Sequence, residues 1–169
     1  MTEHATTAPS GPESRLSDPS KFVPELGAIA GGMTKAAENG SVPRATILLA
    51  QLRIGQLIGS TYHTVVQSGN LREEGEPEER ITAVASWRDA PHYFTGAELV
   101  ALELVDAILT PNPSGERVPD ELFARASAHY DEKALVTLCM AIGRSCFFAP
   151  ITLVGKPSPG RAPGENWRK

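Results

Sequence analysis

Cysteine is scarce in this chain of 169 residues, which contains only Cys139 and Cys146. The two cysteines lie seven residues apart in a stretch with helical periodicity. At a rise of 1.5 Å per residue they would be separated by about 10 Å along a helix, which is too far for a disulfide. We expect both to be small buried hydrophobic residues in the reducing environment of the cytoplasm.

Membrane and nucleic-acid signals are also lacking. No apolar run reaches the roughly 18–20 residues of a membrane span without polar interruption, and no basic region followed by an apolar segment marks a secretory signal. The formal net charge of -4, with no cluster of Lys or Arg, argues against general nucleic-acid binding. We therefore expect a cytoplasmic protein with no membrane or nucleic-acid partner.

The spacing of the apolar residues predicts an all-α protein, because the period-two alternation typical of strands is absent. Residues 1–20 are rich in Thr, Ser, Pro and Ala and are predicted to be a disordered N-terminal tail. Residues 21–155 are predicted to form one helical domain, and residues 156–169 an irregular C-terminal tail in which Trp167 is docked or exposed. About six to seven helices are expected, over residues 22–38, 43–57, 60–74, 77–87, 95–108, 119–129 and 132–148.

Two signals locate helix starts within this domain. Thr95 and Glu98 have the spacing of a capping box, in which each side chain accepts a hydrogen bond from a backbone N–H of the first turn. Gly59 either bends or breaks the long apolar segment 45–66, and if it breaks the segment, Ser60 becomes the N-cap of the next helix. Pro150 is expected to end or kink the last helix.

Four polar residues lie in the apolar segment 45–66 or directly after it. Gln56, Ser60, His63 and Gln67 are spaced i, i+4, i+7 and i+11, so a continuous helix would place them on one face. Burying an unpaired polar group costs about 1–3 kcal/mol. The stripe therefore indicates internal pairing, a partner, or a cavity, and we expect a cavity.

Three blocks of sequence resemble the alkylhydroperoxidase-D-like, carboxymuconolactone decarboxylase superfamily. Residues 52–60 (LRIGQLIGS) are similar to the approach to its active-site helix, and residues 133–142 (KALVTLCMAI) stand in the place of its final core helix. Residues 87–95 (WRDAPHYFT), followed by Glu98 and Leu102, are similar to its Trp-Arg-x-Ser-Pro-x-Phe-Thr-x-x-Glu block. The resemblance implies an all-helical fold that self-associates as a dimer, trimer or hexamer.

The catalytic motifs of that superfamily are not kept. Peroxidase members carry Cys-x-x-Cys-x-x-x-His where this chain has Ser60, His63 and Gln67, so both redox sulfurs are missing. The histidine of the decarboxylase branch would align with Gln67. Because a thiolate is the nucleophile in peroxide reduction, the resemblance implies the fold without the family's peroxidase mechanism.

The candidate catalytic residues are His63, Tyr62, Ser60 and Gln67. His63 titrates near neutrality and is the candidate general acid or base, Ser60 and Gln67 would orient its ring, and Tyr62 could donate to an oxyanion. The alternative is that His63 has no catalytic role and lies in the core or at an interface, with Ser60 and Gln67 as the hydrogen-bond partners of its ring. Metal and cofactor are not expected, because no His-x-x-x-His or Glu-x-x-His pair exists.

The candidate substrate-binding residues are Gln56, Arg144, His92 and Trp87. Arg144 is a charge on an apolar helix and would pair with an anionic ligand or with an acid across a subunit interface. His92 lies in the loop before the capping box, where aromatic side chains either cover a pocket mouth or pack. Arg53 is interpreted as a buried ion pair with a carboxylate such as Glu98 or Glu103.

Three functional hypotheses follow. The first is a cofactor-independent, non-redox enzyme of the lyase, isomerase or decarboxylase type that acts on a small organic molecule, in specialised metabolism for example. The alternative is a non-catalytic ligand-binding or structural family member that has lost the peroxidase centre. A third keeps an alkylhydroperoxidase-type activity through Cys139 or Cys146.

Overall fold

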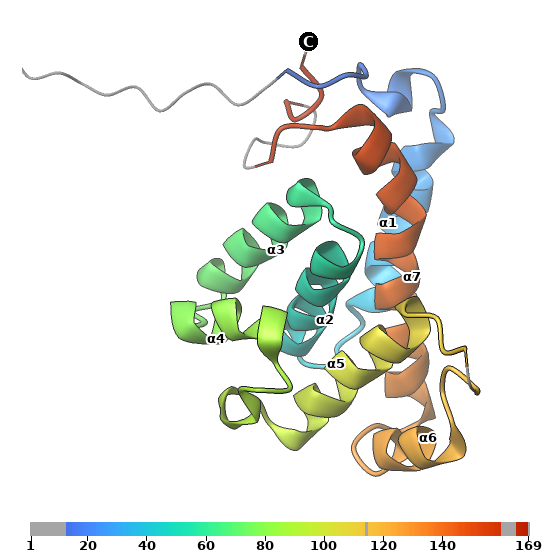
Figure 1. Cartoon of the computed structure of the whole chain (residues 1–169). Coiled ribbons are helices and arrows are strands. Elements are labelled where there is room, and N and C mark those ends of the chain that lie inside the picture. The colour runs from blue at the N-terminus through green and yellow to red at the C-terminus, as the bar shows by residue number, and fades with distance from the viewer. Residues whose placement is uncertain (1–12, 114, 160–164, 169) are drawn as a thin grey trace, which may run out of the picture.

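The computed structural model describes residues 13–113, 115–159 and 165–168, and within these ranges every regular element is a helix, as the sequence predicts. Figure 1 shows α1 and α7 side by side along one edge of the molecule, with α2 to α5 beside them. The α-helices are α1 (Glu25–Ala37), α2 (Arg44–Leu57), α3 (Thr61–Glu73), α4 (Glu78–Ala83), α5 (Gly96–Leu109), α6 (Asp120–Ser127) and α7 (Glu132–Gly155). Three 3-10 helices are η1 (Pro19–Lys21), η2 (Val84–Ser86) and η3 (Pro91–Tyr93).

Helix α2 is the centre of the domain, because it packs against α3, α5 and α7. Most of its residues are buried, as expected for a helix that is apolar on all sides. Ala50 and Ile54 of α2 meet Val105 of α5 and Ile142 of α7 in one apolar cluster. The predicted capping box of Thr95 and Glu98 is confirmed and begins α5.

A buried carboxylate ties α2, α5 and the loop after η2 together. Asp106 of α5 accepts hydrogen bonds from Arg53 of α2, Nε at 2.6 Å and Nη2 at 3.1 Å. Arg88 and the indole N–H of Trp87 donate to the same carboxylate. The partner of Arg53 is thus Asp106 rather than Glu98, which instead accepts from Arg80. Burial raises the pKa of Asp106, but the bonds from Arg53 and Arg88 outweigh burial and hold it below its ordinary value.

We predict that Asp106→Asn lowers the free energy of unfolding by about 3–5 kcal/mol, because it leaves the mostly buried Arg53 guanidinium without its charged partner. Urea denaturation at neutral pH measures the change. Glu103→Gln on the same helix is the matched control. Its partner Arg125 is half exposed, so its loss costs about 1 kcal/mol or less. Equal effects of the two substitutions would contradict the structural role of Asp106.

Helix α7 is longer than the sequence predicts, because it continues through Pro150 to Gly155. A proline removes one backbone hydrogen bond, and the ring of Pro150 is on the exposed side of the helix. With this extension, α7 is long and apolar enough to cross a membrane by length and composition alone. In the structure it packs against α1, α2 and α6 along one side.

The outer face of α7 is apolar and exposed. Val136, Phe147 and Val154 are between 42% and 62% exposed, and Cys139 is exposed on the same helix, which corrects the expectation that both cysteines are buried. No partner chain is present, so self-association stays a prediction.

The two chain-terminal segments meet at one end of the molecule (Figure 1). The backbone N–H groups of Ser14 and Arg15 donate to the carbonyl oxygens of Arg168 and Gly155. Residues 13–20, which were predicted to belong to a disordered tail, are thus paired with the C-terminal segment, while the prediction for residues 1–12 lies outside the described residues. The C-terminal segment has no helix among its described residues.

Candidate functional site

The turn between α2 and α3 places the key histidine. Gly59 has a φ of +67°, a left-handed conformation that favours glycine, and the Ser60 N–H donates to the Gly55 carbonyl. Ser60 then caps α3 by accepting from the backbone N–H of His63. The chain therefore reverses at Gly59, and the continuous polar stripe from Gln56 to Gln67 does not form.

Helices α2 and α3 touch at a glycine. A Cβ atom built on Gly55 would lie 2.9 Å from the His63 Cβ and 2.9 Å from the Thr64 backbone nitrogen, closer than real Cβ contacts. Only glycine at this position lets the first turn of α3 lie directly on α2. One helical turn away from this crossing are Gln51 on α2 and Gln67 on α3, both buried.

His63 is held by two hydroxyl groups on one side of its ring. The Nδ1 atom lies 2.9 Å from Ser60 Oγ and 3.4 Å from Thr152 Oγ1, and Thr152 comes from α7. Its other nitrogen, Nε2, has no hydrogen-bond partner among the described residues. The ring is therefore oriented through Nδ1, which leaves Nε2 available to a ligand.

A cavity of about 320 Å³ lies beside His63, at the small end of the range for ligand pockets. It is enclosed by α1, α2, α3 and α7, together with the segment around η1 and one residue of the C-terminal segment. Its lining residues are Asp18, Pro19, Ser20, Leu26, Gly27, Ala30, Gln51, Tyr62, His63, Val66, Gln67, Arg144, Ser145, Phe148, Ile151, Thr152 and Trp167.

Several buried polar groups on the cavity wall lack protein partners. Gln51 is 2% exposed and Ser145 is 4% exposed, yet neither side chain makes a hydrogen bond to a described residue. Gln67 accepts one bond from Asn70, which leaves its amide N–H groups free. Because these residues line the cavity, their polar groups can hydrogen-bond to water or to a ligand there.

Arg144 supplies the positive charge of the cavity wall. Its Nη1 lies 3.4 Å from Glu38, the residue that follows α1, so Arg144 has an acid partner within its own chain. Burial lowers the pKa of His63, and the nearby Arg144 charge lowers it further. The lowered pKa favours the neutral ring at pH 7, which is the form that accepts a proton as a general base.

The structure brings together some of the residues that were proposed from the sequence. His63, Tyr62, Gln67 and Arg144 line the cavity. Ser60 does not line it but is hydrogen-bonded to the ring of His63. The other three candidates do not line it. They are Gln56, which is half-buried at the end of α2, Trp87, which donates to Asp106, and His92, which is exposed beside Tyr93.

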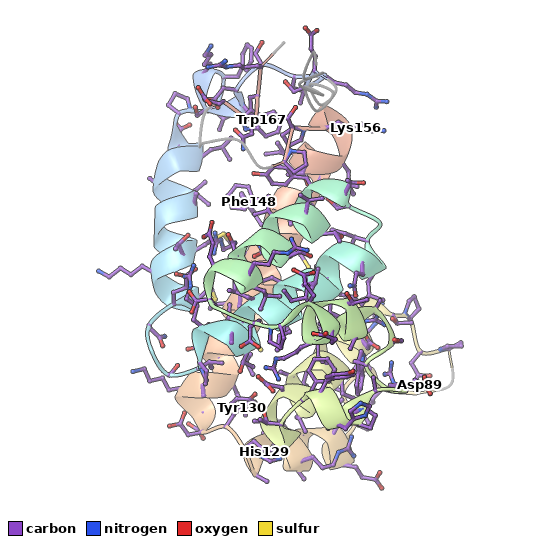
Figure 2. The ribbon with its side chains drawn as sticks, turned by 90° about the vertical axis from the view of Figure 1, so that its left-hand side faces the viewer. Asp89, His129, Tyr130, Phe148, Lys156 and Trp167 are labelled. Atoms are coloured by element: carbon purple, nitrogen blue, oxygen red, sulfur yellow. The ribbon has the colours of Figure 1, made fainter. Side chains whose placement is uncertain are left out.

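Figure 2 shows Phe148 and Trp167 of the cavity toward one end of the molecule, and Asp89, which lies in the chain between Trp87 and His92, toward the other. Trp87 and His92 are conspicuous in sequence because they belong to a family-like block. The contacts of Trp87 and Arg88 with Asp106 give that block a structural role.

Sequence reasoning missed Gln51, Ser145, Thr152 and Trp167. Gln51 is the one with a signal in the sequence, since it is a polar residue between Leu49 and Leu52 in an apolar helix. Ser145, Thr152 and Trp167 reach the cavity only through the tertiary packing of α7 and the C-terminal segment. Among the described residues, no group of three His, Cys, Asp or Glu side chains could hold a metal ion.

Fold and site thus define an all-helical domain with a small cavity at a buried histidine, and known proteins share this arrangement of helices. The chain belongs to the carboxymuconolactone decarboxylase family, whose model matches residues 24–107. It is 35% identical over 124 residues to the uncharacterized protein YdfG of Bacillus subtilis, covering 73% of this chain and 82% of that protein. It is 33% identical over 95 residues to the uncharacterized protein YnjA of Escherichia coli, covering 56% and 50%.

Solved structures share the fold at lower identity. ATU0492 of Agrobacterium tumefaciens, a protein of unknown function and candidate antioxidant defence protein AhpD, superposes with a TM-score of 0.77 at 22% identity, covering 89% of this chain and 100% of that one. A variant of the debrominase Bmp8 in complex with 2,3,4-tribromopyrrole superposes with a TM-score of 0.67 at 18% identity, covering 79% and 70%. These likenesses show the fold alone.

The lowered pKa of His63 predicts a pH dependence of stability. The unfolded chain takes up a proton at a pKa of about 6.5, while the folded chain does so only at lower pH. This contribution is fully present above the unfolded pKa and is lost as the pH falls below it. In urea denaturation between about pH 7 and pH 5, the wild type should lose more stability than His63→Gln. Parallel pH profiles of the two proteins would contradict the burial of a neutral His63.

Proposed function

We propose that the protein is a cofactor-independent, non-redox enzyme in which His63 transfers a proton to or from a small organic substrate. The observation that carries the proposal is the arrangement of His63: the residue lines the cavity, two hydroxyls lie at its Nδ1, and its Nε2 has no hydrogen-bond partner in the described part of the chain. A neutral imidazole held in this way suits general acid–base catalysis. Isomerisation, dehydration and decarboxylation all need such a proton transfer.

Tyr62 is the second group with a catalytic role in this proposal. Its hydroxyl oxygen accepts a hydrogen bond from the Asn166 side chain at 2.9 Å, so its own O–H remains able to donate. Its ring meets the His63 ring edge to face, with centroids 5.7 Å apart. The tyrosine could therefore donate to an oxygen on which negative charge develops while His63 moves the proton.

The remaining polar groups would bind and orient the substrate. Gln51, Gln67 and Ser145 line the same cavity as the histidine and offer hydrogen-bonding groups that no described residue occupies. The walls between these groups are apolar and include Val66, Phe148 and Ile151. Such a lining fits a small, largely apolar molecule with a few polar substituents.

The cysteines do not support a thiol mechanism. Cys139 is exposed on the outer face of α7, and Cys146 packs in the apolar cluster of α2, α5 and α7. Burial raises the pKa of the Cys146 thiol, which disfavours the reactive thiolate. Neither cysteine lines the cavity.

A related fold binds a ligand of the proposed kind, since the debrominase Bmp8 has been seen in complex with 2,3,4-tribromopyrrole, a small planar heteroaromatic compound. This supports a small ring compound as the ligand of the present cavity. The alternative function, a ligand-binding protein without catalysis, uses the same cavity and differs only in whether His63 transfers a proton.

The test is a survey of small cyclic ketones, lactones and enoic acids in D2O, followed by NMR. Proton transfer by His63 would appear as deuterium incorporation, double-bond migration or loss of CO2. For any compound that reacts, His63→Gln should lower kcat by about 10²–10⁴-fold, since general acid–base catalysis contributes that much. His129→Gln, an exposed histidine at the far end of the molecule, is the matched control and should leave kcat unchanged.

Two results would contradict the proposal. One is an unchanged kcat in His63→Gln. The other is hydroperoxide reduction that disappears when Cys139 and Cys146 are replaced by Ser, since this would assign the activity to the thiols. Binding of a compound without any turnover, unaffected by His63→Gln, would favour the ligand-binding alternative.

A further inference from the structure

The C-terminal segment contributes a wall of the cavity. Trp167 lines the cavity together with Phe148 of α7, although 19 residues separate the two in sequence. Figure 2 shows both residues at the end of the molecule where Lys156 completes α7. The family model matches only residues 24–107, so this wall lies outside the matched part of the chain.

Three contacts hold the segment over the cavity. The Asn166 side-chain amide donates to the Tyr62 hydroxyl at 2.9 Å, and the backbone carbonyl of Asn166 accepts from the Ser158 N–H at 2.8 Å. The Arg168 carbonyl accepts from both the N–H and the hydroxyl of Ser14. The segment is therefore tied to α3, to the end of α7 and to the N-terminal segment at once.

A glycine makes room for the tryptophan. A Cβ atom built on Gly155 would lie 2.6 Å from Cζ3 of Trp167 and 3.1 Å from Cδ1 of Leu16. Gly155 is helical and buried, so its backbone conformation does not require glycine. Alanine would be the better helix former by about 1 kcal/mol. What requires glycine here is the close approach of the Trp167 ring.

We propose that Trp167 is a ligand-contacting residue that selects planar aromatic or heteroaromatic ligands. Trp167 and Phe148 give the cavity two aromatic side chains in addition to Tyr62, and aromatic groups attract one another in offset-stacked or edge-to-face arrangements beyond the effect of buried area. A saturated ring of equal size cannot make these contacts. The inference rests on the proposed function only in that the same cavity binds the substrate, and it does not depend on proton transfer by His63.

The first experiment measures the binding of 4-nitrophenol, a small planar aromatic probe, by isothermal titration calorimetry at millimolar concentration, with cyclohexanol as the saturated comparison. The wild type should bind 4-nitrophenol more tightly than cyclohexanol. Trp167→Leu keeps an apolar side chain but removes the ring, and should weaken 4-nitrophenol binding about five- to tenfold. Trp167→Phe keeps a ring and should restore most of the affinity.

The second experiment displaces the tryptophan without replacing it. Gly155→Ala should push the Trp167 ring away from α7, weaken 4-nitrophenol binding as Trp167→Leu does, and increase quenching of tryptophan fluorescence by acrylamide. The signal of Trp87, the other tryptophan, is obtained from Trp167→Phe and subtracted. Gly143→Ala is the matched control, since it is exposed on the same helix with nothing within 4 Å of the added Cβ.

The outcomes separate this inference from the proposed function. Equal binding of 4-nitrophenol by the wild type and Trp167→Leu, no preference over cyclohexanol, or no binding by the wild type would each overturn the role of Trp167. Unchanged quenching in Gly155→Ala would overturn the role of the glycine. The binding experiment requires no turnover, so failure of the proton-transfer test leaves the role of Trp167 standing.

Discussion

The close crossing of α2 and α3 at Gly55 is the constraint on which the site depends. A side chain at Gly55 would occupy the space of the His63 Cβ and the Thr64 backbone, and α3 would have to move outward. The left-handed turn at Gly59 and the Ser60 cap direct the chain into this crossing. Together they fix the first turn of α3 on the central helix and the His63 ring toward α7.

The crossing also accounts for the cavity. Because α3 begins on α2 and α7 supplies Thr152 to the same histidine, the three helices enclose a space that α1 and the chain ends cover. Gln51 and Ser145 place polar groups on its wall that make no hydrogen bond to a described residue. A core selected only for stability would hold apolar residues at these positions, and polar groups that face a cavity are typical of a binding site.

Local sequence signals predicted the local structure well. Thr95 with Glu98, and Ser60 after Gly59, are short-range patterns whose hydrogen bonds lie within one helical turn. The Thr95 cap was predicted outright, and the Ser60 cap was one of the two alternatives at Gly59. The all-helical fold also followed from periodicity. The continuation of α7 through Pro150 was missed, because one absent hydrogen bond is outweighed by the packing of a long helix.

The site itself could be predicted only in part. His63, Tyr62 and Gln67 lie within one stretch of α3, so their shared face is visible in the sequence. Their cavity partners come from α2, α7 and the C-terminal segment, and nothing local indicates that Trp167 meets Gly155. Conversely, Trp87 and Arg88 were conspicuous as a motif, yet tertiary packing directs both to Asp106.

The most direct test of this account is a pH titration of the His63 ring nitrogens by ¹⁵N NMR, with the resonances assigned by comparison with His63→Gln. The account predicts a pKa below the ordinary value of about 6.5, and a 4-nitrophenol-dependent shift that is larger at Nε2 than at Nδ1. A pKa at or above the ordinary value, or an Nε2 signal that no added ligand changes, would show that His63 does not face a functional cavity.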